Sequence, residues 1–157
     1  MIERIIAIAV GYVCGLFLSG FLYGKSRHVD VRQSGSGNVG TTNTLRTLGW
    51  KAGAVTLAGD ILKVFAAMFI IWLIFHKSQP ELVRLYEMYA GFGAVLGHDF
   101  PVYMGFKGGK GIASTGGLVL AFCPFAAPVS LGLFILTVLV TKYVSLGSIL
   151  GLISLFV

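Results

Sequence analysis

Charged residues are scarce in this sequence. Only 11% of the 157 residues are charged, 56% are hydrophobic, and the mean hydropathy is +0.88. So few charged side chains cannot cover the surface of a soluble domain of this size. The scarcity therefore excludes the soluble classes and predicts an all-α, polytopic integral membrane protein with the lipid bilayer as its solvent.

Acidic residues and cysteine are scarcer still. Six acids stand against 12 lysines and arginines, which gives a net charge of +6. The cations gather in short loops and no nucleic-acid-binding module accompanies them, so we expect no nucleic-acid partner. Cys14 and Cys123 lie in apolar runs with no second cysteine or histidine at metal-ligand spacing, which favours packing roles. We expect neither a metal nor a cofactor.

Long uncharged runs define the expected membrane spans. Five spans are expected, over residues 5–24, 52–75, 82–100, 112–122 and 125–141. The first has twenty uncharged residues, enough for one helix to cross about 30 Å of hydrocarbon. Pro124 separates the last two, and one kinked helix over residues 112–141 is the alternative. A sixth run begins at Ile149 and is still too short to cross at Val157, so we expect further spans beyond this sequence.

Positive charge sets the expected orientation. One loop, residues 25–51, carries a single acid, Asp30, against the cations Lys25, Arg27, Arg32, Arg46 and Lys51. The positive-inside rule therefore puts this loop in the cytoplasm and the N-terminus outside. The turn at residues 76–80 is then external, and the loop at residues 97–111 is cytoplasmic. A cleaved secretory signal is the alternative for the first run, but Glu3 and Arg4 cancel instead of forming a positive n-region.

The most polar stretch is the first glycine loop, residues 35–43. Its glycines let successive backbone N–H groups point to one centre, its hydroxyls add donors, and Arg46 follows one turn later. This combination predicts phosphate binding. The candidate ligands are Gly35, Ser36, Gly37, Asn38, Gly40, Thr41, Thr42 and Asn43. The spacing matches a dinucleotide fingerprint, but a membrane span precedes it where that motif requires a strand.

The second glycine loop, residues 107–111, repeats this chemistry. It consists of Lys107, Gly108, Gly109, Lys110 and Gly111. It is no Walker A motif, because Gly111 stands where a serine or threonine would bind magnesium. A tight turn with helix caps is the alternative for either loop alone. Two such loops with cations on one membrane face favour a site for phosphorylated substrates.

A few polar residues inside the apolar runs are further candidates. Asp60 and Lys63 share a helix face, so we expect them to pair or to face a polar cavity, as a structural ion pair or in a substrate role. His98, beside Asp99, is the histidine nearest the second glycine loop. It is a catalytic candidate, and a helix-end histidine bonded to a free carbonyl is the alternative. Residues 143–148 are expected to form a third small-polar loop.

These motifs together resemble a known family. The resemblance rests on residues 35–46, Asp60-Ile-Leu-Lys63, Gly97-His98 with Pro101-Val102, residues 106–111, and Ser145-Leu-Gly-Ser148. In this order they closely resemble the bacterial acyl-phosphate:glycerol-3-phosphate acyltransferase family, PlsY. Thr41 stands where the family commonly has alanine, and Val64 where it commonly has glycine.

The resemblance implies a seven-span enzyme of the bacterial inner membrane with its active site on the cytoplasmic face. Such an enzyme transfers a fatty acyl group from acyl phosphate to the 1-hydroxyl of glycerol 3-phosphate, giving lysophosphatidic acid and phosphate, the first step of bacterial phospholipid synthesis. It implies site roles for Ser36, Arg46, Lys110 and Ser148, with Ser145 beside them. A C-terminal segment with a functional histidine and asparagine would follow Val157.

On this interpretation residues 1–157 form one transmembrane acyltransferase domain, cut before its last spans. Phosphate is already a good leaving group, so positioning and charge stabilisation suffice without a covalent acyl-enzyme. His98, Asp99 or the substrate's own phosphate could accept the hydroxyl proton. The alternative function is a small anion or phosphate transporter, against which the missing inverted repeat counts.

Overall fold

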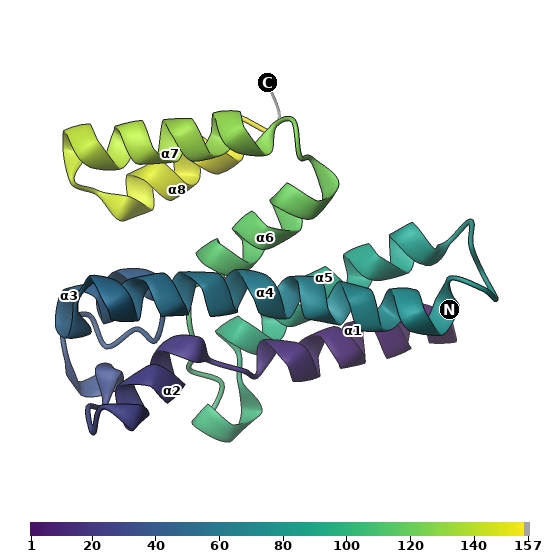
Figure 1. Ribbon diagram of the computed structural model, residues 1–157, viewed down its shortest axis with the longest axis horizontal. Coiled ribbons are helices and arrows are strands. Elements are labelled where there is room, and N and C mark those ends of the chain that lie inside the picture. Colours follow the sequence, from purple (N-terminus) through teal and green to yellow (C-terminus); the bar gives the residue numbers. More distant parts are fainter. Residues whose placement is uncertain (156–157) are drawn as a thin grey trace. The chain divides into compact units, whose positions relative to one another are not determined.

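The computed structural model describes residues 1–155, which contain helices and turns and no strand (Figure 1). The chain divides into two compact units, Met1–Leu118 and Val119–Val157. Helix α6 (Ile112–Phe122) contains the boundary between them. The predicted all-α class is confirmed for the described part of the chain.

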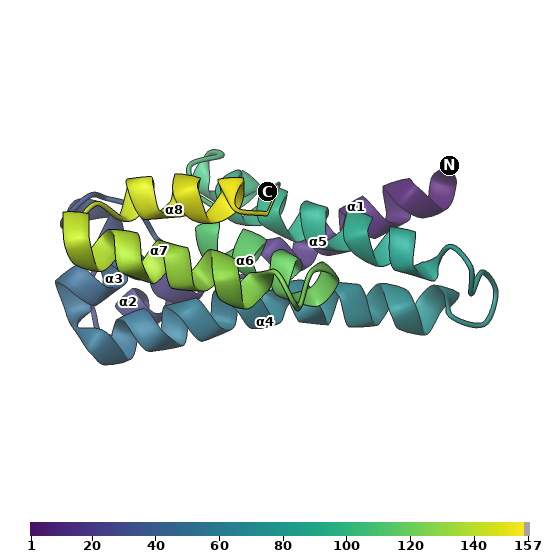
Figure 2. The same cartoon turned by 90° about the horizontal axis from the view of Figure 1, so that it is seen from above.

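Three long helices make the body of the first unit. Its helices are α1 (Ile2–Gly15), α2 (Ser19–Ser26), α3 (Thr41–Leu48), α4 (Trp50–Phe75) and α5 (Val83–Asp99), with the short 3-10 turns η1 (Val31–Gln33) and η2 (Val102–Met104). Helices α1, α4 and α5 lie side by side in both views (Figure 1; Figure 2). Two stretches, Ile2–Ser26 and Trp50–Phe75, are long and apolar enough to cross a bilayer.

Glycine lets α1 and α5 pack backbone against backbone. We call Gly11, Gly15, Gly93 and Gly97 the glycine seam. A Cβ atom on any of them would overlap a backbone carbonyl oxygen of the facing helix. In lipid the hydrophobic effect does not hold helices together, so small residues that permit close van der Waals packing take its place. The seam therefore fixes the spacing and register of α1 against α5.

The first apolar run is not one helix, which corrects the prediction for residues 5–24. Helix α1 ends at Gly15 and α2 begins at Ser19, after an extended Leu18. Leu18 is fully buried against Val31 and Val39, residues that follow later in the chain. This packing and the hydrogen bond from the Lys63 ammonium to the Phe17 carbonyl stabilise the break, because a carbonyl released from a helix needs another donor.

The cytoplasmic loop predicted over residues 25–51 is partly helical. It contains α3, and α4 begins directly after Gly49, whose φ of +86° joins the two helices. Helix α5 has nearly the bounds of the apolar run at residues 82–100. Helix α3 therefore contains the last three residues of the first glycine loop, Thr41, Thr42 and Asn43.

The second unit contains α7 (Ala127–Thr141) and α8 (Val144–Ile153), which lie side by side (Figure 2). Helix α6 ends at Phe122 before Pro124, so two separate helices replace the alternative of one kinked helix. The prediction of a third small-polar loop over residues 143–148 was wrong, because residues 144–148 are helical. Gly147 and Gly151 allow α8 to approach the backbone of α7, and this packing outweighs the polar composition.

Candidate functional site

A paired arginine holds the turn that precedes the first glycine loop. Asp30 accepts hydrogen bonds from the backbone N–H of Arg32 (3.0 Å) and from its guanidinium (2.7 Å). These bonds lower the pKa of Asp30 to about 2. The pair loses its charge attraction only as the pH falls toward that value, so both groups stay ionised at physiological pH. Arg32 therefore stabilises the turn.

Asn43 holds the first glycine loop in shape. Its buried side chain accepts a hydrogen bond from the Ser36 N–H (2.8 Å) and donates to the carbonyls of Val31 (2.9 Å) and Ser34 (3.0 Å). A Cβ on Gly35, which has φ +61°, would overlap the Asn43 carboxamide oxygen. The Asn43 side chain is thus committed to the loop, and its backbone N–H is the group it can offer to an anion.

The N-terminus of α3 is open to an anion. Gly40 precedes the helix, and within residues 1–155 no side chain caps it. The first-turn N–H groups of Thr41, Thr42 and Asn43 have no backbone acceptor among the described residues. They carry the positive end of the helix dipole. Thr41 also has a buried hydroxyl with no hydrogen-bond partner in the described chain.

The second glycine loop is fastened to the end of α5. The Gly108 N–H donates to the Asp99 carbonyl (3.0 Å), and the Gly109 N–H donates to the His98 carbonyl (2.9 Å). The chain then turns through Gly111 into α6. A second helix N-terminus therefore follows directly after Lys110.

The two glycine loops, which the sequence predicted to share one membrane face, are in contact. The Asn38 side-chain amide donates to the Gly108 carbonyl at 3.4 Å, across 70 residues of sequence. The Asn38 carboxamide oxygen also accepts from the Gly40 N–H (2.9 Å). Asn38 therefore connects the start of α3 with the second glycine loop, a bridging role that the sequence did not indicate.

The cations near the loops lack acidic partners. Arg46 on α3 and the two lysines of the second glycine loop, Lys107 and Lys110, are exposed. None of the three forms an ion pair within residues 1–155. Unpaired cations beside open N–H groups favour the binding of a multiply charged anion.

A buried polar network lies beneath the second glycine loop. The Lys63 ammonium lies 2.9 Å from the Asp60 carboxylate and 2.6 Å from His98 Nδ1. It also donates to the Phe17 carbonyl (3.1 Å), which lies in the break between α1 and α2. The predicted Asp60–Lys63 pair is confirmed. Its contact with His98 was not predicted, because 35 residues separate the two side chains.

The serines predicted for the third loop belong to the second unit. Ser145 is exposed in the first turn of α8. Ser148 is buried, and its hydroxyl donates to the Val144 carbonyl four residues earlier (2.9 Å).

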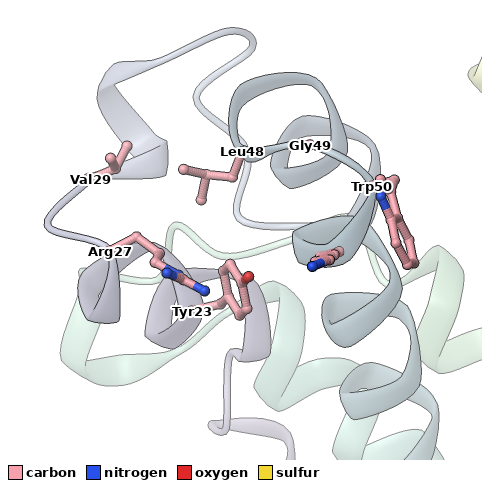
Figure 3. A pocket seen from close by; sticks show the side chains of 7 residues that line it. Tyr23, Arg27, Val29, Leu48, Gly49 and Trp50 are labelled. Atoms are coloured by element: carbon pink, nitrogen blue, oxygen red, sulfur yellow. The ribbon is translucent and has the colours of Figure 1, made fainter.

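A cavity of about 390 Å³ lies at the other end of α3 from the first glycine loop. Its lining consists of Tyr23, Arg27, Val29, Leu48, Gly49, Trp50 and Lys51. Figure 3 shows Arg27 beside Tyr23, with the guanidinium 5.5 Å from the ring centroid. Lys51 lies 5.9 Å from the ring of Trp50. Such aromatic and cationic pairs are typical of the membrane interface, and neither glycine loop lines this cavity.

Fold and site together define a class of protein. The chain is a multi-pass helical membrane protein in which two glycine loops are in contact and their cations form no ion pair among the described residues. A family model described as glycerol-3-phosphate acyltransferase matches residues 5–157. The chain belongs to the glycerol-3-phosphate acyltransferase family.

Curated relatives agree with this assignment. The glycerol-3-phosphate acyltransferase of Chlorobium phaeobacteroides is 40% identical over 160 residues, which cover 98% of this chain and 68% of that protein. The one from Alkaliphilus metalliredigens is 44% identical over 147 residues, covering 93% of this chain and 72% of that protein.

Solved structures give the same answer. The crystal structure of PlsY (YgiH), an integral membrane glycerol 3-phosphate acyltransferase, in its glycerol 3-phosphate form matches with a TM-score of 0.83 and 37% identity. The match covers 96% of this chain and 73% of that one. The lysophosphatidic acid form matches with a TM-score of 0.81 and 36% identity. The family assignment favours the acyltransferase hypothesis over the transporter alternative.

Proposed function

We propose that this protein transfers a fatty acyl group from acyl phosphate to the 1-hydroxyl of glycerol 3-phosphate, releasing lysophosphatidic acid and inorganic phosphate. The hydroxyl oxygen attacks the acyl carbonyl carbon, the bond from that carbon to the phosphate oxygen breaks, and the hydroxyl proton leaves with the phosphate or through solvent. The reaction takes place at the cytoplasmic face of a bacterial inner membrane, with the N-terminus outside.

One observation carries this proposal: the two glycine loops lie in direct contact. The reaction brings together two substrates that each carry a phosphate group. The Asn38–Gly108 hydrogen bond supports binding of both phosphates within one site. Nearby Arg46 and Lys110 would offset the repulsion between the two anions and stabilise charge on the leaving phosphate.

The remaining site residues take supporting roles. The free backbone N–H groups of Thr41, Thr42 and Asn43 at the start of α3 hold phosphate oxygens, and the hydroxyls of Ser36, Thr41 and Thr42 add donors. Ser145 and Ser148 are proposed as site members because of the family motif that they match. Because phosphate leaves readily, holding the hydroxyl close to the acyl carbon contributes most of the rate enhancement.

The identity of the acyl donor, acyl phosphate or acyl-coenzyme A, tests this proposal most directly. We expect acyl transfer to glycerol 3-phosphate from acyl phosphate and none from acyl-coenzyme A, because the proposed site binds a phosphate with backbone groups and nearby cations. Magnesium should be dispensable, since those cations already neutralise the phosphates. The assay follows labelled lysophosphatidic acid made by the full-length protein in vesicles. Strict dependence on acyl-coenzyme A would refute the proposal.

The orientation can be measured by cysteine labelling. A membrane-impermeant thiol reagent added to intact cells should modify the variant Ser78→Cys, which lies between α4 and α5, but not Gln33→Cys in η1. Both variants are made after Cys14 and Cys123 are replaced by serine, so that the reagent reports the new site alone. Labelling of Gln33→Cys without Ser78→Cys would reverse the proposed topology.

A further inference from the structure

The buried network described above is unusual for a membrane helix bundle. Asp60, Lys63 and His98 come from α4 and α5, and their exposed fractions are 1%, 5% and 2%. Ionisable side chains are costly in the hydrocarbon region and mark functional positions there. All three side chains are buried within the part of the chain that the structure describes.

The second glycine loop rests on one member of this network. A Cβ atom on Gly109 would overlap the Nε2, Cε1 and Cδ2 atoms of the His98 imidazole. The Gly109 N–H also donates to the carbonyl of His98 itself (2.9 Å). Only a residue without a side chain can lie this close to the ring, so the ring sets the height of the loop.

Lys63 fixes the imidazole on its other side. Its ammonium lies 2.6 Å from His98 Nδ1, and the same ammonium bonds to Asp60 and to the Phe17 carbonyl. The ring is therefore held by a group that is itself bonded to α4 and to the break between α1 and α2. A rotation of the imidazole would break the Lys63 contact and release Gly109 together.

We propose that the Asp60–Lys63–His98 network positions the second glycine loop, with His98 acting through Gly109 and not on the substrate. A general base needs a free ring nitrogen within reach of the substrate hydroxyl. Here Nδ1 faces Lys63 and the Nε2 edge lies under Gly109. The inference rests on the proposed function only where the loop's effect on substrate affinity is measured.

The contact between His98 and Gly109 provides a double-mutant test. Gly109→Ala adds a methyl group that collides with the imidazole, and should raise KM for one of the two phosphorylated substrates about tenfold or more. His98→Asn keeps an acceptor for Lys63 at the Nδ1 position but removes the outer ring atoms. On its own it should raise the same KM about threefold or more with kcat little changed, because the loop loses its support. The double variant should recover much of the KM lost in Gly109→Ala.

A second readout does not depend on activity. Lys107 and Lys110 are exposed trypsin sites within the second glycine loop, so the rate of cleavage there reports how firmly the loop is held. Gly109→Ala should be cleaved faster than the parent, and the double variant more slowly than Gly109→Ala. His76→Asn, at the far end of α4, is the matched control and should change neither KM nor cleavage.

Each remaining outcome decides the question. If His98→Asn lowers kcat about a hundredfold with both KM values unchanged, His98 is a catalytic base. If the double variant is no better than Gly109→Ala, the ring does not support the loop.

Asp60→Asn with Lys63→Met removes both buried charges at similar volume, and should also accelerate cleavage. Unchanged cleavage would overturn the network's role. Failure of acyl phosphate as a donor, with the cleavage pattern as expected, would refute the proposed function alone.

Discussion

Replacing Arg46 or Lys110 with alanine is expected to abolish nearly all acyl transfer. If the proposed function holds, each substitution removes a charged contact to a substrate phosphate, which contributes about 3 kcal/mol, or roughly a hundredfold in kcat/KM. Neither cation has an acidic partner in the described chain, so no structural ion pair is lost with it. The measurement is the initial rate of lysophosphatidic acid formation by purified protein in vesicles.

Two further variants separate charge from geometry. Arg46→Lys keeps the charge but loses the planar fork that grips two phosphate oxygens, so activity should fall about tenfold. Lys77→Ala removes an exposed cation just after α4 and should leave activity unchanged. Near-normal rates in both Arg46→Ala and Lys110→Ala, in protein that is folded and inserted, would exclude the phosphate site.

The largest loss of stability is expected from an added methyl group in the glycine seam. Gly11→Ala forces a Cβ into the Ala90 carbonyl of α5. Because a backbone atom cannot move aside as a side chain can, the helices must separate, at a cost of about 2 kcal/mol or more. Thermal unfolding in detergent, followed by the fluorescence of the two tryptophans, should show a lower midpoint.

Gly116→Ala is the matched control for that substitution. Gly116 also lies inside a helix, α6, but a Cβ there would meet no atom within 4 Å. Alanine favours the helix over glycine by about 1 kcal/mol, so the midpoint should stay the same or rise. Equal midpoints for Gly11→Ala and Gly116→Ala would show that close approach of α1 and α5 contributes nothing to stability.

Composition and periodicity predicted the helices wherever local sequence decides the structure. The run at residues 82–100 forms the helix α5, and Pro124 falls between α6 and α7. The break at Leu18 could not be predicted, because neither proline nor glycine marks residues 16–18. It depends on Val31 and on the Lys63 ammonium, which come from other parts of the chain.

In the candidate site, too, the features that depend on local sequence could be predicted, and those that depend on tertiary contacts could not. Glycine, hydroxyl and cationic residues identified both glycine loops, since their chemistry is local. The commitment of Asn43 to the loop and the contact between His98 and Gly109 are tertiary, and residue type alone does not reveal them. An amide or an imidazole in a polar motif can bind a ligand or hold the motif in shape, and only its neighbours distinguish the two.

The glycine seam also has a geometric consequence. Backbone faces backbone along it, so there are no side chains whose rotamers could absorb a gradual shift of α1 along α5. A small shift of α1 along α5 would therefore cause steric overlap at several of these glycines at once, so the two helices keep one register. Helix α5 carries His98 and the start of the second glycine loop at its C-terminal end. Helix α1 is followed by Phe17 and then by the chain that leads to the first glycine loop. The gap between the two loops is therefore set by helix register, far from any group that touches a substrate.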